Sequence, residues 1–241
     1  MSSPLMAKQL IGKTPFFKHM VFDLDGTLID SSPDILTCLQ QSLDAHHVVY
    51  DATALQPTLI GPPVQHILPK ILKTEVSPEV VQAVVATFRR RYDSLNETQA
   101  SLYPAMLPWL QQLIDQGCTL FIATNKPKQP ALFLLETFKL LPYFKAVITI
   151  DALPNQKLTK TEMLAHLIET FNLPPEITPM IGDTLGDMQA AHTVGMIPVA
   201  TQWGYAENRE ALYQSARYTL ETPTLVASPF CEKGTLHAES V

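Results

Sequence analysis

The chain has 241 residues, of which 46% are hydrophobic and 17% charged, and its formal net charge is −6 at pH 7. This length and apolar content suffice for a buried core and exclude a disordered chain. The acidic balance excludes a non-specific grip on nucleic acid or an anionic membrane surface, and no apolar stretch approaches a membrane span. Three scattered cysteines, odd in number and without metal-ligand spacing, indicate a reducing, cytoplasmic location. The oligomeric state is left open.

The two ends of the chain are expected to lie outside the folded domains. Residues 1–17 lack the apolar segment and small-residue cleavage site of a signal peptide, so they are predicted to be a short extension. Residues 228–241 show no hydrophobic periodicity and are predicted to be a tail.

The first predicted strand, residues 18–23, leads two carboxylates into a turn. Residues 20–22 are apolar, and Asp23 and Asp25 point to the same face while the chain stays extended. Gly26 then permits a tight turn and a close approach of the backbone to a ligand. Because carboxylates at the end of a buried strand cost free energy, a bound cation or a reaction is the natural explanation.

Residues 32–102 contain helix signals and no convincing strand. Ser32 followed by Pro33 predicts a helix N-cap with proline at the first helical position, and Ser77 with Pro78 predicts another. About seventy helical residues inserted after the first acid motif predict a second, smaller domain, a helical cap that can close over a bound substrate.

From residue 103 the main domain, comprising residues 18–31 and 103–227, resumes. A helix is predicted over 106–116, ended by Gly117. Alternation of strands with helical patterns predicts a doubly wound α/β fold with a mostly parallel sheet, whose ligand site lies at the carboxyl ends of the strands. The further predicted strands are residues 119–124, 146–150, 179–183 and 197–201.

A second acid motif follows the predicted strand 179–183. Gly182 and Asp183 end its apolar run, and Asp187 follows four residues later. Two strand ends that carry acids predict a divalent-cation site, and Mg²⁺ favours a few carboxylate oxygens, waters and a substrate phosphate.

A lysine near residue 160 is the candidate phosphate-binding cation. Thr159 and Glu162 have capping-box spacing, which places Lys160 in the first turn of a helix. A cation there opposes the helix dipole, so stability gives no reason for it, whereas a phosphate docked beside that N-terminus does. We prefer Lys160 to the alternative, Lys157.

These motifs, in this order, resemble the haloacid dehalogenase superfamily, in the branch similar to phosphoglycolate phosphatases. The resemblance covers roughly residues 18–220, through the motifs at 23–28, 123–127 and 182–187 together with the lysine. The chain departs from the family's commonest pattern because no prolines follow Lys160. The resemblance implies a Rossmann-type core with an inserted helical cap.

The resemblance also assigns roles to residues. It makes Asp23 the nucleophile that forms an aspartyl-phosphate and Asp25 the general acid and base. Mg²⁺ is expected on Asp23, Asp183 and the backbone carbonyl of Asp25, with Asp187 positioning a water or the loop. Substrate contacts are expected from Thr124, Asn125, Lys126 and Lys160. For Lys126 a solvated loop lysine is the open alternative.

The predicted function is Mg²⁺-dependent hydrolysis of a small phosphate monoester, with phosphoglycolate as the leading substrate by resemblance. A phosphosugar mutase of the β-phosphoglucomutase type, a pyrophosphatase or nucleotidase, and a non-catalytic regulatory protein are the alternatives. Dehalogenase chemistry is disfavoured, because those relatives lack an acid equivalent to Asp25. The only partner expected is the small phosphate ester.

Overall fold

The computed structural model describes residues 17–223, and within them the core is a parallel sheet of six strands in the order β5-β4-β1-β6-β7-β8. The predicted α/β class is thereby confirmed, although β8 was not expected. The predicted tail 228–241, and the predicted extension except for buried Phe17, lie outside the described residues. The strands are β1 (His19–Phe22), β4 (Thr119–Thr124), β5 (Phe144–Thr149), β6 (Pro179–Gly182), β7 (Ile197–Thr201) and β8 (Tyr218–Leu220).

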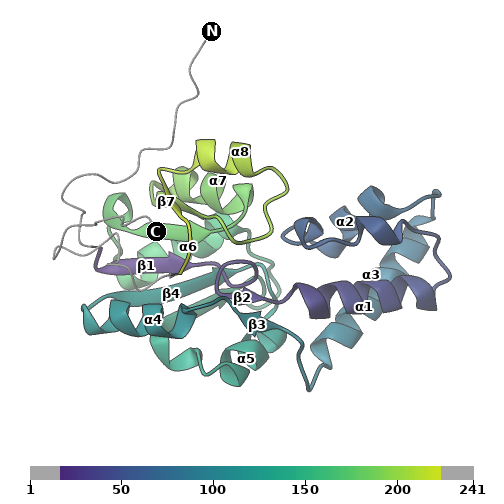
Figure 1. Cartoon of the computed structure of the whole chain (residues 1–241), viewed down its shortest axis with the longest axis horizontal. Coiled ribbons are helices and arrows are strands. Elements are labelled where there is room, and N and C mark those ends of the chain that lie inside the picture. Colours follow the sequence, from purple (N-terminus) through teal and green to yellow (C-terminus); the bar gives the residue numbers. More distant parts are fainter. Residues whose placement is uncertain (1–16, 224–241) are drawn as a thin grey trace, which may run out of the picture.

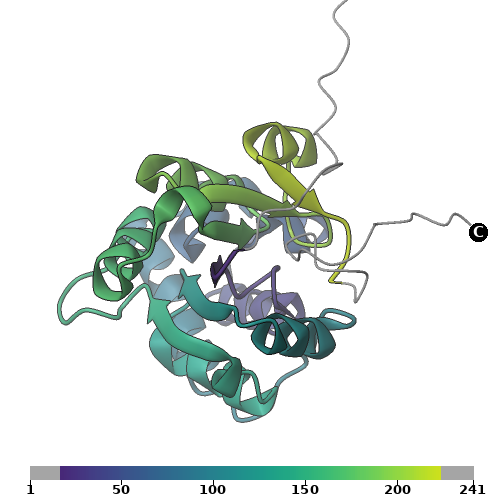
Figure 2. The same ribbon diagram turned by 90° about the vertical axis from the view of Figure 1, so that its left-hand side faces the viewer.

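Helices cover both faces of the sheet (Figures 1 and 2). Side chains alternate along the strands, so Phe22 packs among the residues of one face and Val21 among those of the other. Helices α4 (Met106–Asp115) and α5 (Lys128–Thr137) pack on the Phe22 face, and α6 (Lys160–Phe171) and α7 (Leu185–Val194) on the Val21 face. The short α8 (Arg209–Ser215) packs beside α7.

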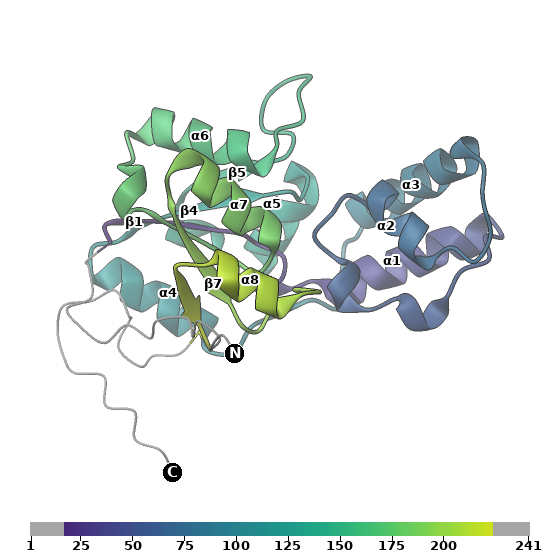
Figure 3. The ribbon, with the colours of Figure 1, turned by 90° about the horizontal axis from the view of Figure 1, so that it is seen from above.

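Three further helices form a separate unit beside the sheet, here called the cap helices (Figure 3). They are α1 (Ser32–Ala45), α2 (Val64–Ile71) and α3 (Pro78–Asp93), with short 3-10 turns at Ala52–Ala54 and Pro57–Leu59 between α1 and α2. Their apolar faces make a hydrophobic cluster of their own around residues such as Leu39, Leu43 and Leu68.

Two short antiparallel strands connect the cap helices to the sheet domain. Strand β2 (Ile29–Asp30) pairs with β3 (Ser101–Leu102), so the stretch expected to be free of strands ends in one. Two residues are too few to show hydrophobic alternation, so no sequence pattern predicts this short strand. Among residues 17–223, no helix has the length and apolar character needed to cross a membrane.

The N-terminus of α1 differs by one residue from the prediction. The N-cap is Ser31 and not Ser32, and the Ser31 side chain makes no cap hydrogen bond. Its hydroxyl donates to Asp25 Oδ1 at 2.5 Å, and the Ser32 hydroxyl donates to Asp30 Oδ1 at 2.6 Å. Nearby carboxylates therefore replace the helix backbone as partners of both serines. The predicted cap at Ser77 is confirmed, since its hydroxyl accepts from Val80 N.

We predict that Asp34 is important for stability, because its buried carboxylate fastens α1 to the returning chain. It accepts hydrogen bonds from Thr98 Oγ1 and from Gln99 N, the latter at 2.9 Å. Asp34→Ala is expected to lower the free energy of unfolding by about 1.5–3 kcal/mol, measured by urea denaturation. Asp34→Asn keeps one carbonyl oxygen as acceptor and is expected to lose less. Wild-type stability in the alanine variant would contradict this role.

Candidate active site

The strand order brings the separated motifs to one place. Strand β1 lies between β4 and β6, with Phe22 opposite Ile122 and Ile181, and Asp23 N donates to Ile181 O at 2.9 Å. The chain builds the sheet outward from β1 on one side through β4 and β5, then returns to β1 with β6. Ligands of open α/β sheets bind at such a switch point, outside the carboxyl ends of the strands.

Three carboxylates converge there. One carboxylate oxygen from each of Asp23, Asp183 and Asp187 lies within 4.8 Å of the others, and these residues are 8%, 0% and 1% exposed. Asp23 Oδ1 and Asp187 Oδ1 both face the Lys160 ammonium, at 2.8 and 2.9 Å. Because one ammonium balances only part of the charge of three carboxylates, the cluster favours a further cation, and all-oxygen ligands fit a hard divalent one. The cluster is therefore suited to hold a metal ion.

Neighbouring groups fix the orientation of the acids from the second motif. Asp183 accepts from Thr27 Oγ1 at 3.0 Å and from Tyr205 N at 2.8 Å. Asp187 uses one oxygen, Oδ2, in a capping box with Thr184 at the start of α7, which leaves Oδ1 directed at the cluster. Hydrogen bonds to the ligating carboxylates of this kind hold a metal site in shape.

Two glycines permit the close packing around Asp183. A Cβ atom at Gly204 would lie 2.2 Å from Asp183 Cβ and 2.5 Å from the Gly26 carbonyl oxygen. A Cβ at Gly26, whose φ is +79°, would lie 2.2 Å from Asp183 Oδ2. The loop that begins at Trp203 can cover the acid cluster only because no side chain stands at these positions.

Lys160 contributes a cation to the cluster. Its Nζ lies 2.8 Å from Asp23 Oδ1 and 2.9 Å from Asp187 Oδ1, and it donates to the Ala123 carbonyl at 2.7 Å. The predicted capping box of Thr159 is present, and it sets Lys160 at the first position of α6. The alternative, Lys157, is exposed in the preceding loop.

Burial makes the charged forms of these side chains unfavourable, and their pKa values shift accordingly. Burial raises the pKa of Asp23 to about 7, an effect that Lys160 opposes and Asp187 reinforces. Burial, followed by the neighbouring charges of Asp187 and Asp23, also raises the pKa of Asp183 well above its usual range. For Lys160, burial acts to lower the pKa, but the two carboxylates raise it above its ordinary value, so the ammonium stays charged.

Asp25 is not part of this cluster of three carboxylates and pairs with a second lysine. Lys126 Nζ donates to both Asp25 oxygens, at 2.8 and 3.0 Å, and to Tyr92 Oη at 2.5 Å. The Lys126 side chain is only 2% exposed, so the solvated-lysine alternative is wrong. The Lys126 backbone N donates to the Thr124 hydroxyl at 3.1 Å, while Asn125 between them is exposed.

Sequence reasoning missed the roles of Ser31 and Tyr92. Ser31 bonds Asp25, and Tyr92 reaches Lys126 from α3. Each lies on a segment that reads as an ordinary helix start or apolar helix face, so no local signal marks it.

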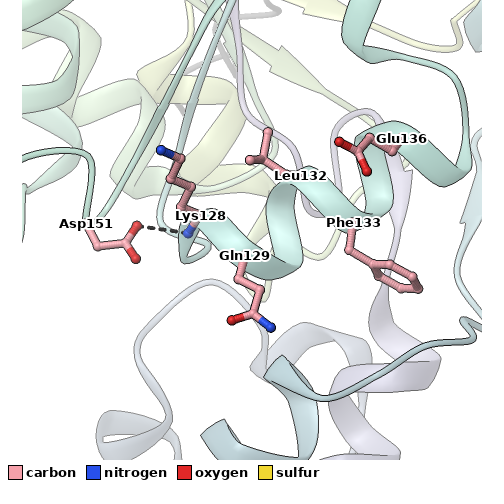
Figure 4. A pocket seen from close by; sticks show the side chains of 6 residues that line it. All are labelled: Lys128, Gln129, Leu132, Phe133, Glu136 and Asp151. Atoms are coloured by element: carbon pink, nitrogen blue, oxygen red, sulfur yellow. Dashed lines mark hydrogen bonds between the residues drawn. The ribbon is translucent and has the colours of Figure 1, made fainter.

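One surface hollow lies away from these acids. It has a volume of about 520 Å³ along α5, where Asp151 accepts from Lys128 N at 2.8 Å (Figure 4). None of the clustered acids lines it; its residues are Lys128, Gln129, Leu132, Phe133, Glu136 and Asp151. The cluster of three carboxylates, and not the size of a surface hollow, therefore locates the candidate site.

Comparisons with known proteins identify the family of this chain. Residues 20–201 match the haloacid dehalogenase-like hydrolase family, so the chain belongs to that family of enzymes. It is 32% identical over 203 residues to a phosphoglycolate phosphatase of Rhodobacter capsulatus, covering 83% of this chain and 91% of the relative. A phosphoglycolate phosphatase of Nitrosospira multiformis is 28% identical over 215 residues, covering 88% and 92%.

A solved structure shows the same fold. A haloacid dehalogenase-like family protein of Streptococcus pneumoniae matches with a TM-score of 0.75 at 25% identity, over 86% of this chain and 95% of that one. The resemblance predicted from the motifs, to the phosphoglycolate phosphatase-like branch of this family, is thus confirmed.

We predict that the ionised Asp183 carboxylate lowers the free energy of unfolding when no metal is bound. Its raised pKa means that the ionised carboxylate weakens the fold at pH 7, above its unfolded pKa. Asp183→Asn can accept from Tyr205 N and donate to the rotatable Thr27 hydroxyl, so it is expected to raise the free energy of unfolding in EDTA by about 1 kcal/mol or more. In thermal melts, Mg²⁺ should stabilise the wild-type protein and not this variant. Stabilisation of both by Mg²⁺ would contradict a metal role for Asp183.

Proposed function

We propose that this protein hydrolyses a small phosphate monoester through an aspartyl-phosphate on Asp23, with Mg²⁺ bound at Asp23, Asp183 and the Asp25 carbonyl. The observation that carries the proposal is the convergence of three buried carboxylates with the Lys160 ammonium at the switch point of the sheet. Relatives named phosphoglycolate phosphatase support the choice of a phosphate ester as substrate.

In the first step, a carboxylate oxygen of Asp23 forms a bond to phosphorus while the bond to the leaving-group oxygen breaks. Asp25 enters this step protonated on one oxygen, while its other oxygen still accepts from Lys126. It transfers that proton to the leaving-group oxygen, so the product leaves as an alcohol. In the proposed arrangement Lys160 and the Thr124 hydroxyl bind the phosphoryl oxygens. Asp25 follows the nucleophile by two residues, and 17% of its side chain is exposed.

In the second step, Asp25 takes a proton from a water molecule whose oxygen bonds to phosphorus, and the bond between phosphorus and Asp23 breaks. Inorganic phosphate and the free Asp23 carboxylate are the products. When bound, Mg²⁺ would neutralise part of the repulsion between the phosphate and the carboxylates. Lys160 contributes in the same way from the protein, since it lies against Asp23 and Asp187.

The experiment that tests this function is phosphate release from a panel of small phosphate esters, phosphoglycolate first, with and without Mg²⁺. Turnover is expected with Mg²⁺ only, and Asp23→Asn is expected to lower it by about a thousandfold or more, as for loss of other nucleophiles. Asp115→Asn removes an exposed carboxylate and serves as the matched control. No phosphate release from any ester would overturn hydrolysis, and appearance of a sugar bisphosphate would indicate a mutase.

A second prediction separates the two candidate lysines. Lys160→Met removes the cation from Asp23 and Asp187 and is expected to lower kcat by about a hundredfold or more, the scale of losing one electrostatic stabiliser. Lys157→Met alters an exposed loop residue and is expected to change kcat by less than about twofold. Steady-state kinetics on folded variants, checked by circular dichroism, decide between them. The reverse pattern would reassign the phosphate-binding lysine.

A further inference from the structure

The Lys126 ammonium has all three of its N–H donors committed. Two go to the Asp25 oxygens, at 2.8 and 3.0 Å, and one goes to Tyr92 Oη at 2.5 Å. A substrate anion can reach Lys126 only if one of these bonds breaks. The geometry therefore favours a role for Lys126 in holding Asp25 over a direct grip on the substrate.

Of the three hydrogen-bonded residues Asp25, Lys126 and Tyr92, Tyr92 belongs to the cap helices. It lies in the last turn of α3 and is 6% exposed, with its ring stacked on Phe88 at 5.6 Å and 7° between planes. The Lys126 Nζ lies 4.6 Å from the centre of the same ring. The adjacent Asp93 carbonyl accepts from Gln129 Nε2 at 2.7 Å, so the end of α3 contacts the sheet domain at two points.

The Tyr92 hydroxyl has no other evident use. A buried phenol needs a hydrogen-bond partner, but a phenylalanine would fill the same space between Phe88 and Lys126 without that need. Burial raises the pKa of Tyr92 to about 12, so the group stays a neutral phenol at physiological pH. It acts on Lys126 as a fixed hydrogen-bond acceptor.

We propose that Tyr92 is a positioning residue that holds Lys126, through which the seated cap helices fix the Asp25 carboxyl group for proton transfer to the leaving group. This inference rests on the proposed function, because it assigns a reason for the placement of its general acid. When α3 moves away, Lys126 loses one of its three partners and Asp25 loses a rigid support. Efficient protonation of the leaving group is thereby coupled to the position of the cap.

The test uses phenyl phosphates whose leaving groups differ in acidity but little in shape, with Mg²⁺ present. The value of kcat/KM reports the step in which the leaving group departs. The 4-nitrophenolate anion is a good leaving group and departs without being protonated. The more basic phenolate departs faster when an acid protonates its oxygen. General acid catalysis is worth about 10²–10⁴-fold, so we expect Tyr92→Phe to lose about tenfold in kcat/KM for phenyl phosphate and less than about twofold for 4-nitrophenyl phosphate.

Tyr50→Phe is the matched control, because it removes another tyrosine hydroxyl from the segment that contains the cap helices. The Tyr50 hydroxyl donates to Asp44 Oδ1 at 3.0 Å and makes no bond to Lys126. It should leave the ratio of the two substrates unchanged. If Tyr92→Phe leaves the ratio of kcat/KM for the two substrates unchanged, whether or not both values fall, the proposal is overturned and Tyr92 serves packing alone.

A double-mutant cycle keeps the test decisive if one variant is unstable. In a Lys126→Met background, Tyr92→Phe should have no further effect on the ratio, because the group that transmits its effect is gone. Full additivity of the two substitutions would overturn the proposal. If the wild-type protein releases phosphate from no ester of the panel, then the proposed function itself fails, and that result is distinct from a failure of the Tyr92 role.

Discussion

The arrangement depends on three buried carboxylates held together against their mutual repulsion. Asp23, Asp183 and Asp187 would each be more favourably placed in water, and the ammonium of Lys160 lies between two of them. Raised pKa values at Asp23 and Asp183 express this unfavourable burial. A fold that keeps such a cluster loses stability, and it gains a site that is suited to hold a cation.

The ion pair of Asp25 and Lys126 is separate from the cluster of three carboxylates and Lys160, and its environment is different. Lys160 belongs to the sheet domain through α6 and the Ala123 carbonyl, whereas Lys126 also reaches the cap helices through Tyr92. In the proposed mechanism the two lysines have separate tasks: Lys160 neutralises charge around the nucleophile, and Lys126 supports the acid that serves the leaving group. In that proposal the task of Lys126 depends on where the cap helices lie.

Local signals in the sequence were read correctly where a single segment decides the structure. The capping box of Thr159 and the cap at Ser77 are present, because each depends on residues within one turn. The prediction failed at Ser32, since the hydroxyls of Ser31 and Ser32 are drawn to Asp25 and Asp30 instead of the helix backbone. Strands β3 and β8 escaped notice because two or three residues carry no periodic pattern.

The sequence by itself determined the alternation of strands and helices and the acids that follow two of the strands, because hydrophobic periodicity and motif spacing are local properties. Burial of Lys126 and its bonds to Asp25 and Tyr92 were decided only by tertiary structure. Residues 92 and 126 belong to separate helical and sheet units, and their contact depends on how those units pack. No pattern within either segment can encode a partner that the other segment supplies.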